Sequence, residues 1–214
     1  MEIIKHCLKY GVSSYDNTYV YKFQNNNKNN KEEIKEIKKY NVFVRIHKLK
    51  DEVNISIRGT DDLSDWFNNI RRWKTTFLTK AKVHTGFLEH LNYVYDDIIN
   101  EIKDYKNINI IGHSLGGAVS VLLGSKICFL DKTINCKVVT YGAPRVGDNK
   151  FRSLCNALSN LECYRVYNKY DFVTKVPYFG FYHVGLKYKV KSKNISFYKL
   201  KQTHSMMTYM KALL

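Results

Sequence analysis

The feature that most constrains the fold lies in the middle of the chain, where an apolar strand leads into a glycine-flanked serine and then into an apolar helix. The predicted strand covers Ile108–Ile111, residues 112–116 read GHSLG, and the predicted helix covers Leu115–Leu130. A G-x-S-x-G sequence between a strand and a helix is typical of a nucleophile elbow, a sharp turn that lifts a serine hydroxyl above a sheet. A Cβ atom at either flanking glycine would collide with a neighbouring element. The alternative, a Gly-Ser turn that caps the helix, explains neither the paired glycines nor the apolar strand.

The rest of the chain alternates predicted strands and helices. Strands are expected at 42–46, 53–57, 137–141 and 163–167, and helices at 1–10, 31–40 and 87–102, with a further helix starting after His204. The helix at 31–40 is expected from the spacing of Ile34 and Ile37, and the aromatic stretch 179–184 is strand-like. This alternation predicts an α/β fold with a mainly parallel central sheet and helices on both faces. A chain of 214 residues that is 44% hydrophobic can form one domain, so we expect a single domain over 1–214.

The ends and the cysteines suggest a location. The N-terminal MEIIKHCLKYG has no signal-peptide core, and the chain has no apolar run long enough to span a membrane. The five cysteines are odd in number and form no CxxC pair, which favours free thiols in a reducing compartment. We therefore expect a cytoplasmic protein, with peripheral membrane contact as an option. No HExxH sequence or Cys/His cluster predicts a metal, and no cofactor is expected.

The chain is strongly basic, with 35 Lys and Arg against 19 Asp and Glu and a net charge of +16. A nucleic acid or an anionic membrane would be a natural partner for such a charge. Compositional bias from an AT-rich genome explains the abundant Lys, Asn, Ile and Tyr equally well, so no nucleic-acid partner is expected. Lys187, Lys189 and Lys191 alternate with apolar residues and would share one face of a strand. They predict either an anionic lipid contact or a guarded sheet edge.

A serine nucleophile needs a base, and the base needs an orienting acid, in the chain order Ser, acid, His on sheets of this kind. After Ser114 the acids are Asp131, Asp148, Glu162 and Asp171. Asp131 and Glu162 precede strands and would lie at the edge of the sheet away from the site. Asp148 and Asp171 follow strands, and Asp171 is closer to its strand end, so it is preferred while Asp148 remains open.

The base is either His183 or His204, the histidines that follow Ser114. His183 lies in the strand-like aromatic stretch, where a histidine is more often structural. His204 lies in a loop directly before a helix whose Met206, Tyr209, Met210 and Leu213 share a face. Loop residues held at a helix start often carry function, so His204 is preferred.

Several blocks of the sequence, in order, resemble the class 3 lipases, the fungal-type triacylglycerol lipases with an α/β-hydrolase fold. The blocks are Ile57–Thr60 with Asp65 and Trp66, Val83–Phe87, Ile111–Ala118, Tyr141–Asp148, then Val166, Asn168, Asp171, Val173 and Pro177, then Tyr182–Gly185 and His204. The resemblance implies that Ser114 is the nucleophile, Asp171 the acid and His204 the base. It also implies an oxyanion hole formed by the N–H groups of Thr60 and Leu115.

The resemblance further implies a lid from Asp61 to about Lys80. Its apolar side chains suit a lipid surface, although helix packing explains the same spacing. They are Leu63, Trp66, Phe67, Ile70, Trp73 and Phe77. Asn69 stands where family members often carry Asp.

The function that follows is hydrolysis of lipid-type carboxylic esters through an acyl-enzyme: a lipase, monoacylglycerol lipase or phospholipase A1. The alternatives are an acyltransferase or thioesterase with the same triad, and a non-catalytic lipid- or protein-binding module that retains the fold. The oligomeric state is not predicted.

Overall fold

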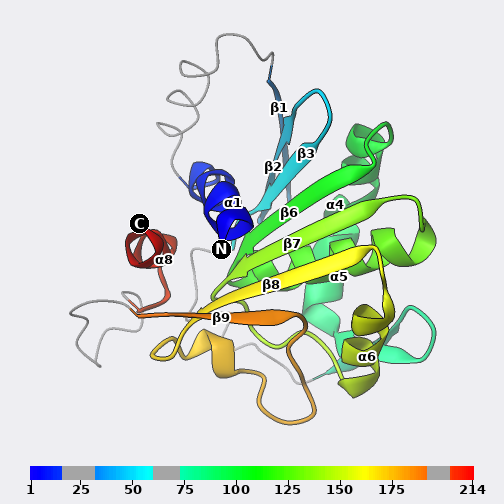
Figure 1. The fold of residues 1–214 in the computed structure, drawn as a ribbon. Helices are drawn as coiled ribbons and strands as arrows, with labels where there is room; N and C mark the ends of the chain where they lie inside the picture. The colour runs from blue at the N-terminus through cyan, green and yellow to red at the C-terminus, as the bar shows by residue number, and fades with distance from the viewer. Residues whose placement is uncertain (16–31, 60–72, 192–202) are drawn as a thin grey trace.

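The computed structural model describes residues 1–15, 32–59, 73–191 and 203–214. Within these ranges seven strands form one sheet in the order β1-β2-β3-β6-β7-β8-β9. They are β1 (Glu33–Lys39), β2 (Val42–Lys48), β3 (Val53–Ile57), β6 (Asn107–His113), β7 (Asn135–Tyr141), β8 (Leu161–Asn168) and β9 (Leu186–Val190). The strands from β3 to β9 pair in parallel, and β1 and β2 pair antiparallel at one edge (Figure 1). The mainly parallel sheet is confirmed.

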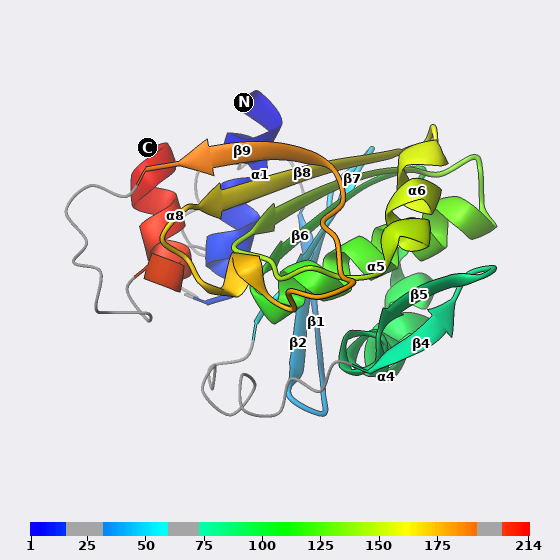
Figure 2. The same ribbon diagram turned by 90° about the horizontal axis from the view of Figure 1, so that it is seen from below.

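Helices cover both faces of this sheet, as predicted. One face carries α1 (Glu2–Ser13) and α8 (Met206–Leu213), and the other carries α4 (Thr85–Ile102), α5 (Leu115–Leu130) and α6 (Asn149–Ala157) (Figure 2). The buried positions of α4 recur at helical spacing: Phe87, Leu91, Val94, Ile98 and Ile102. α5 packs on β6 and β7 and is buried on nearly all sides, which explains its almost continuous apolar sequence.

The central strands position the site. β6 is buried on both faces, with Ile110 and Ile111 fully inaccessible, as expected of a strand between two helical layers. β6, β7 and β8 run in parallel, so their carboxyl ends at His113, Tyr141 and Asn168 meet at one edge of the sheet. Loops that leave these ends are thereby gathered at that edge.

The predicted helix at 31–40 is wrong, because Glu33–Lys39 forms the edge strand β1. Tyr40 and Asn41 both adopt positive φ, at 46° and 65°, and join β1 to β2 in a two-residue hairpin turn. Glu36 faces Arg45 across the pair and accepts a hydrogen bond from its guanidinium at 2.5 Å. The spacing of the two isoleucines fits a helix equally well, but the free edge of β2 offered a ladder of backbone hydrogen bonds. Tertiary pairing therefore overrides local spacing.

Two further differences concern segments near the site. β4 (Lys74–Phe77) and β5 (Ala81–His84) form an unpredicted antiparallel pair. Phe77 is buried and packs edge-on against Phe151, so the predicted lid extends too far: this end of it is core. The aromatic stretch 179–184 is not a strand; Tyr182 makes one isolated bridge to Gly147. Residues 61–72 of the predicted lid lie outside the described residues.

Candidate active site

Ser114 occupies the sharp turn that the sequence predicted. It follows β6 directly, precedes α5 and has φ 58° and ψ −128°, a conformation that costs a side-chain-bearing residue on the order of 1–3 kcal/mol. Both flanking glycines are required by close backbone approach. A Cβ at Gly112 would meet the carbonyl of Gly116, and a Cβ at Gly116 would meet the carbonyl of Ile57. The structure therefore has the backbone strain and the packing of a nucleophile elbow.

Asp171 and His204 come together although 33 residues separate them. Asp171 lies just past the end of β8 and His204 just before α8, and both side chains are inaccessible to solvent. His204 Nδ1 lies 2.7 Å from Asp171 Oδ2. A carboxylate oxygen accepts, so Nδ1 carries the proton and the lone pair is left on Nε2. The pair has the tautomer that a general base requires.

The Asp171 carboxylate is held by two further donors. Val173 donates its N–H to Oδ1 at 2.9 Å, and Tyr209 on α8 donates its hydroxyl to Oδ2 at 2.6 Å. Burial, followed by the charge of Asp171, raises the pKa of Tyr209 well above its ordinary value, so the phenol keeps its proton. Tyr209 was predicted only to share a helix face with Met206, Met210 and Leu213, and nothing in local spacing marks its link to the acid.

The two atoms between which a proton would move are both without a hydrogen-bond partner in the part of the chain that the structure describes. Ser114 Oγ and His204 Nε2 are both buried, and neither has a hydrogen-bond partner among the described residues. The ring of His113, the residue before Ser114, lies 4.7 Å from the ring of His204 between centroids. Unpartnered buried polar atoms are costly and therefore mark positions where a ligand is expected to bind. Such contacts tighten when substrate binds.

The competing acids are engaged elsewhere. Asp148 caps α6 and accepts a hydrogen bond from the N–H of Phe151 at 2.8 Å. Asp131 accepts a hydrogen bond from the Thr133 hydroxyl, and Glu162 lines a hollow at the amino ends of the central strands. Of these acids only Asp171 bonds a histidine side chain among the described residues.

His183 is structural rather than part of this pair. Its Nε2 bonds the Thr174 carbonyl at 2.7 Å, so Nε2 is the donor and no lone pair is left there to act as a base. Burial and the positive charge of Arg165 lower the pKa of His183 to about 3, so the ring is neutral.

Of the two predicted oxyanion donors, Leu115 is among the described residues. Leu115 is the first residue of α5, and its N–H belongs to the first turn, whose donors have no acceptor within the helix. Gly59, two residues past the end of β3, packs so closely on the elbow that a Cβ there would lie 2.9 Å from Ser114 Cβ. Thr60, and with it the lid residues Leu63, Trp66, Phe67 and Ile70, lies outside the described residues.

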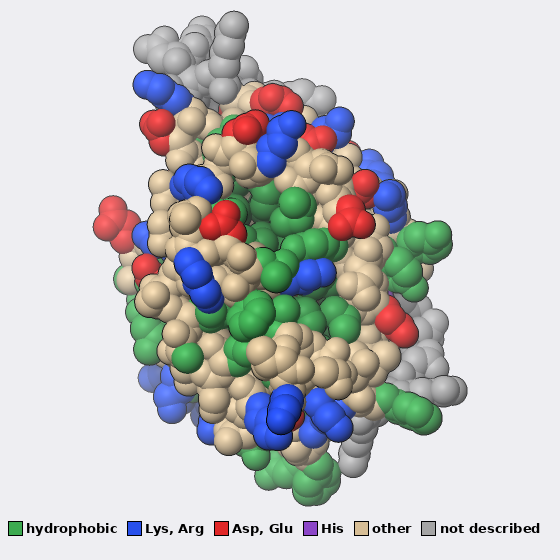
Figure 3. All heavy atoms as spheres, turned by 90° about the vertical axis from the view of Figure 1, so that its right-hand side faces the viewer, with side chains coloured by type: hydrophobic (Ala, Val, Ile, Leu, Met, Phe, Trp, Pro, Cys, Tyr) green, Lys and Arg blue, Asp and Glu red, His purple; other side chains and the backbone are tan. Residues whose placement is uncertain are grey.

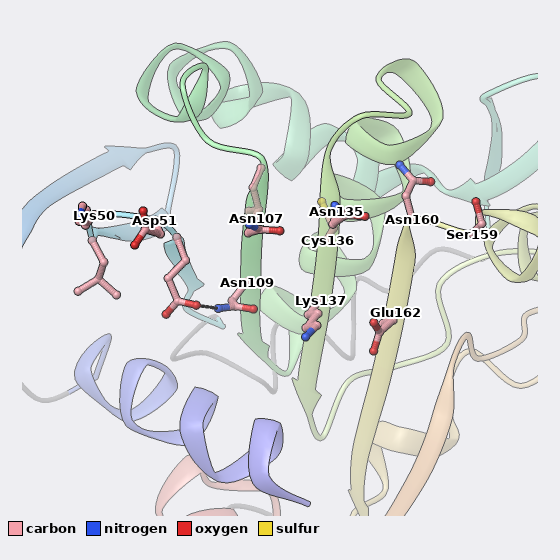
Figure 4. A pocket seen from close by; sticks show the side chains of 13 residues that line it. Lys50, Asp51, Asn107, Asn109, Asn135, Cys136, Lys137, Ser159, Asn160 and Glu162 are labelled. Carbon is pink, nitrogen blue, oxygen red and sulfur yellow. Dashed lines mark hydrogen bonds between the residues drawn. The ribbon is translucent and has the colours of Figure 1, made fainter.

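A separate hollow of about 510 Å³ lies at the opposite edge of the sheet, at the amino ends of β6, β7 and β8 (Figure 4). Lys50, Asp51 and Lys137 are among its polar lining, and Asn109 bonds Glu52 there at 3.2 Å. None of the predicted site residues lines this hollow.

On the side of the molecule drawn in Figure 3, acidic and basic side chains are interspersed and hydrophobic side chains gather in the centre.

The described residues contain no group of three or more His, Cys, Asp or Glu side chains that could hold a metal ion. None of the helices in those ranges is long and apolar enough to cross a bilayer.

The fold and the serine elbow define an α/β-hydrolase. The family model described as Lipase (class 3) matches residues 54–181, more than half of the chain. The chain therefore belongs to the class 3 lipase family, as its motifs suggested.

Individual relatives agree with this assignment. The chain is 31% identical over 157 residues to the "Secreted mono- and diacylglycerol lipase 1" of Fusarium solani, covering 68% of this chain and 46% of that protein. It is 35% identical over 114 residues to "Phospholipase A1-II 4" of Oryza sativa subsp. japonica, covering 50% of this chain and 29% of that protein. The chain thus spans less than half the length of these curated relatives. Lipase II from Rhizopus niveus has the same fold, with a TM-score of 0.74, 22% identity, and coverage of 95% of this chain and 88% of that one.

The predicted cytoplasmic location is wrong. It is contradicted by the relatives, of which those from Fusarium solani and Malassezia globosa are named secreted proteins. The five cysteines are free, as predicted, but four of them are buried. Burial raises the pKa of Cys7 and of Cys155 to about 12, which keeps these thiols protonated and unreactive. Unpaired thiols of this kind give no information about the redox state of the compartment.

The depressed pKa of His183 predicts acid sensitivity. Between about pH 6.5 and 3 the unfolded chain binds a proton at this ring that the folded chain excludes. The free energy of unfolding therefore falls as pH falls through this window, by at most about 1.4 kcal/mol per pH unit from this residue. His183→Gln does not titrate and retains an amide donor for the Thr174 carbonyl. Urea unfolding across the window is expected to give a shallower pH dependence for the variant, and parallel curves for the two proteins would contradict this account.

Proposed function

We propose that the protein hydrolyses carboxylic esters of lipids, with Ser114 as nucleophile, His204 as general base and Asp171 as the acid that orients it. The observation that carries the proposal is the buried Asp171–His204 pair, whose free Nε2 shares the site with the unpartnered Ser114 hydroxyl. A serine hydroxyl is a weak nucleophile unless a base of this kind is at hand.

In the proposed reaction, Ser114 Oγ attacks the ester carbonyl while His204 Nε2 takes the hydroxyl proton. The carbonyl oxygen becomes an oxyanion, which the N–H of Leu115 would stabilise at the start of α5, together with the Thr60 N–H that the family resemblance implies. Each such donor contributes about 3 kcal/mol to the transition state. His204 then protonates the departing alcohol, and water hydrolyses the acyl-enzyme by the same steps.

Lipid substrates are favoured by two observations. The relatives bear the names mono- and diacylglycerol lipase and phospholipase A1, and those named secreted favour action outside the cytoplasm. Large aromatic side chains are also exposed on the segment of chain that follows Asp171, with exposed fractions of 47% for Phe172, 62% for Tyr178 and 67% for Phe179. Phe172 directly follows Asp171. Aromatic side chains of this kind suit contact with a lipid–water interface.

The triad assignment predicts how single substitutions act. Ser114→Ala is expected to lower kcat by about 10⁴-fold or more, because triad members act as a unit. Asp171→Asn is expected to lower kcat to a similar extent, because an amide leaves His204 in the wrong tautomer. Nitrophenyl esters of increasing chain length, followed by glycerides and phospholipids, provide the measurement.

Asp148→Asn is the matched control, since it makes the same change at the other acid that follows a strand. It is expected to retain activity, because an asparagine still caps α6. An inactive Asp148→Asn beside an active Asp171→Asn would overturn the assignment.

The lysines of β9 generate a second prediction. β9 is an edge strand of the sheet, with Lys187 and Lys189 exposed on one side, Lys191 exposed just beyond it, and Val190 buried on the other side. Each lysine close to an anionic bilayer contributes about 1 kcal/mol. Changing all three to Gln is therefore expected to weaken sedimentation with phosphatidylserine liposomes by about a hundredfold, if the strand faces the lipid.

The control changes the exposed Lys50, Lys103 and Lys106 to Gln, which removes the same charge from the loops that precede β3 and β6, away from β9. It is expected to bind like the wild type. Equal, salt-insensitive binding by all three proteins would leave the β9 lysines as guards of a free sheet edge.

A further inference from the structure

We propose that Tyr15 and His113 form a positioning relay that holds the backbone of His204 in register with the serine elbow. The inference rests on the proposed function, because it gives these two side chains a purpose only if His204 acts as the base for Ser114. Neither is proposed to touch the substrate. Both are positioning residues that act through His204.

The first link joins His113 to the main chain of the base. His113 is the last residue of β6, and its Nε2 lies 2.5 Å from the carbonyl oxygen of His204. A carbonyl oxygen accepts, so Nε2 must carry the proton and donate it. The residue before the nucleophile is thereby bonded to the backbone of the base, 91 residues away in sequence.

The second link joins Tyr15 to the other ring nitrogen of His113. Tyr15 Oη lies 2.9 Å from His113 Nδ1. Burial lowers the pKa of His113 well below its ordinary value, so the ring is neutral and holds one proton, already placed on Nε2. Nδ1 is therefore an acceptor, and the Tyr15 hydroxyl donates to it. The hydroxyl selects the tautomer that can bond the His204 carbonyl.

The third link reaches the end of β3. The N–H of Gly59 donates to Tyr15 Oη at 2.9 Å, which satisfies the oxygen that has just donated its proton. Every donor in the chain now meets an acceptor: Gly59 N–H to Tyr15, Tyr15 O–H to His113, and His113 N–H to His204. Gly59 also contacts the elbow and precedes Thr60, so the relay spans the nucleophile, the base and the strand end that leads to the proposed oxyanion donor.

The relay and the Asp171 bond fix different parts of His204. Asp171 holds the ring at Nδ1, and His113 holds the main-chain carbonyl. His204 lies two residues before α8, and this carbonyl bond ties the backbone of the base directly to the last residue of β6. Misplacing the base by a fraction of an ångström would slow proton transfer while leaving the substrate surface intact.

Tyr15→Phe tests the relay, since it removes one hydroxyl and retains the ring. The expected result is a kcat about tenfold lower with KM unchanged, because the variant loses the half-buried hydrogen bond that sets the His113 tautomer, together with the one that Tyr15 accepts from Gly59. Tyr141→Phe is the matched control. Its hydroxyl is buried, donates to the Ile4 carbonyl of α1 at 2.7 Å and has no part in the relay. The control is expected to lose stability and to retain kcat.

His113 variants separate positioning from packing. His113→Gln retains an amide donor that can reach the His204 carbonyl, whereas His113→Leu retains only bulk. The glutamine variant is expected to keep at least tenfold more kcat than the leucine variant, and Tyr15→Phe is expected to add little to His113→Leu because the relay is already broken. Equal kcat in the glutamine and leucine variants, or full kcat in Tyr15→Phe, would overturn the relay.

A measurement on the unaltered protein keeps the inference testable if a variant fails to fold. Nitrogen-15 NMR of the histidine side chains is expected to find His113 neutral and protonated on Nε2, and a ring protonated on Nδ1 or on both nitrogens would overturn the relay. Ser114→Ala distinguishes the two proposals. If it retains activity, the proposed function fails; if it is inactive while Tyr15→Phe is fully active, only the relay fails.

Discussion

The strained backbone at Ser114 is the constraint on which the rest of the structure depends. A serine at φ 58° is unfavourable and persists only where the surroundings leave no alternative. Here β6 is fixed between β3 and β7, α5 is buried on nearly all sides, and Gly112 and Gly116 let the two elements approach to backbone contact. The apolar strand, the paired glycines and the apolar helix are thus one device that presents a hydroxyl at the carboxyl edge of the sheet.

The other half of the site depends on long-range contacts made by the last part of the chain. β8 delivers Asp171 to the same edge, and α8 folds back so that His204 and Tyr209 both meet that carboxylate. α8 is held there by its buried face, which packs with α1 in a core on one side of the sheet. The position of the His204 ring, with its free lone pair on Nε2, therefore depends on hydrophobic packing as well as on the hydrogen bond to Asp171.

Sequence reasoning succeeded where local pattern and tertiary environment agree. The bounds of α5 were predicted to the residue, because strand, glycine turn and apolar helix all indicate the same structure. It failed at β1, where the spacing of Ile34 and Ile37 fits a helix but the edge of β2 selects a strand. Tyr15, His113 and Tyr209 carry no local signal for their contacts, since each bond joins segments at least 38 residues apart. The lysine pattern of β9 predicted which side of the strand is exposed, but it did not predict that β9 pairs in parallel with β8.

The central claim is that Ser114 is a nucleophile activated by the buried His204, and covalent labelling tests it most directly. A fluorophosphonate reacts with an activated serine and forms a stable phosphonyl ester on its oxygen. Mass spectrometry of the digested protein is expected to find one phosphonyl group per chain, on Ser114, with ester hydrolysis lost in proportion to labelling. Label on a different residue, or hydrolysis that survives complete labelling of Ser114, would contradict the account.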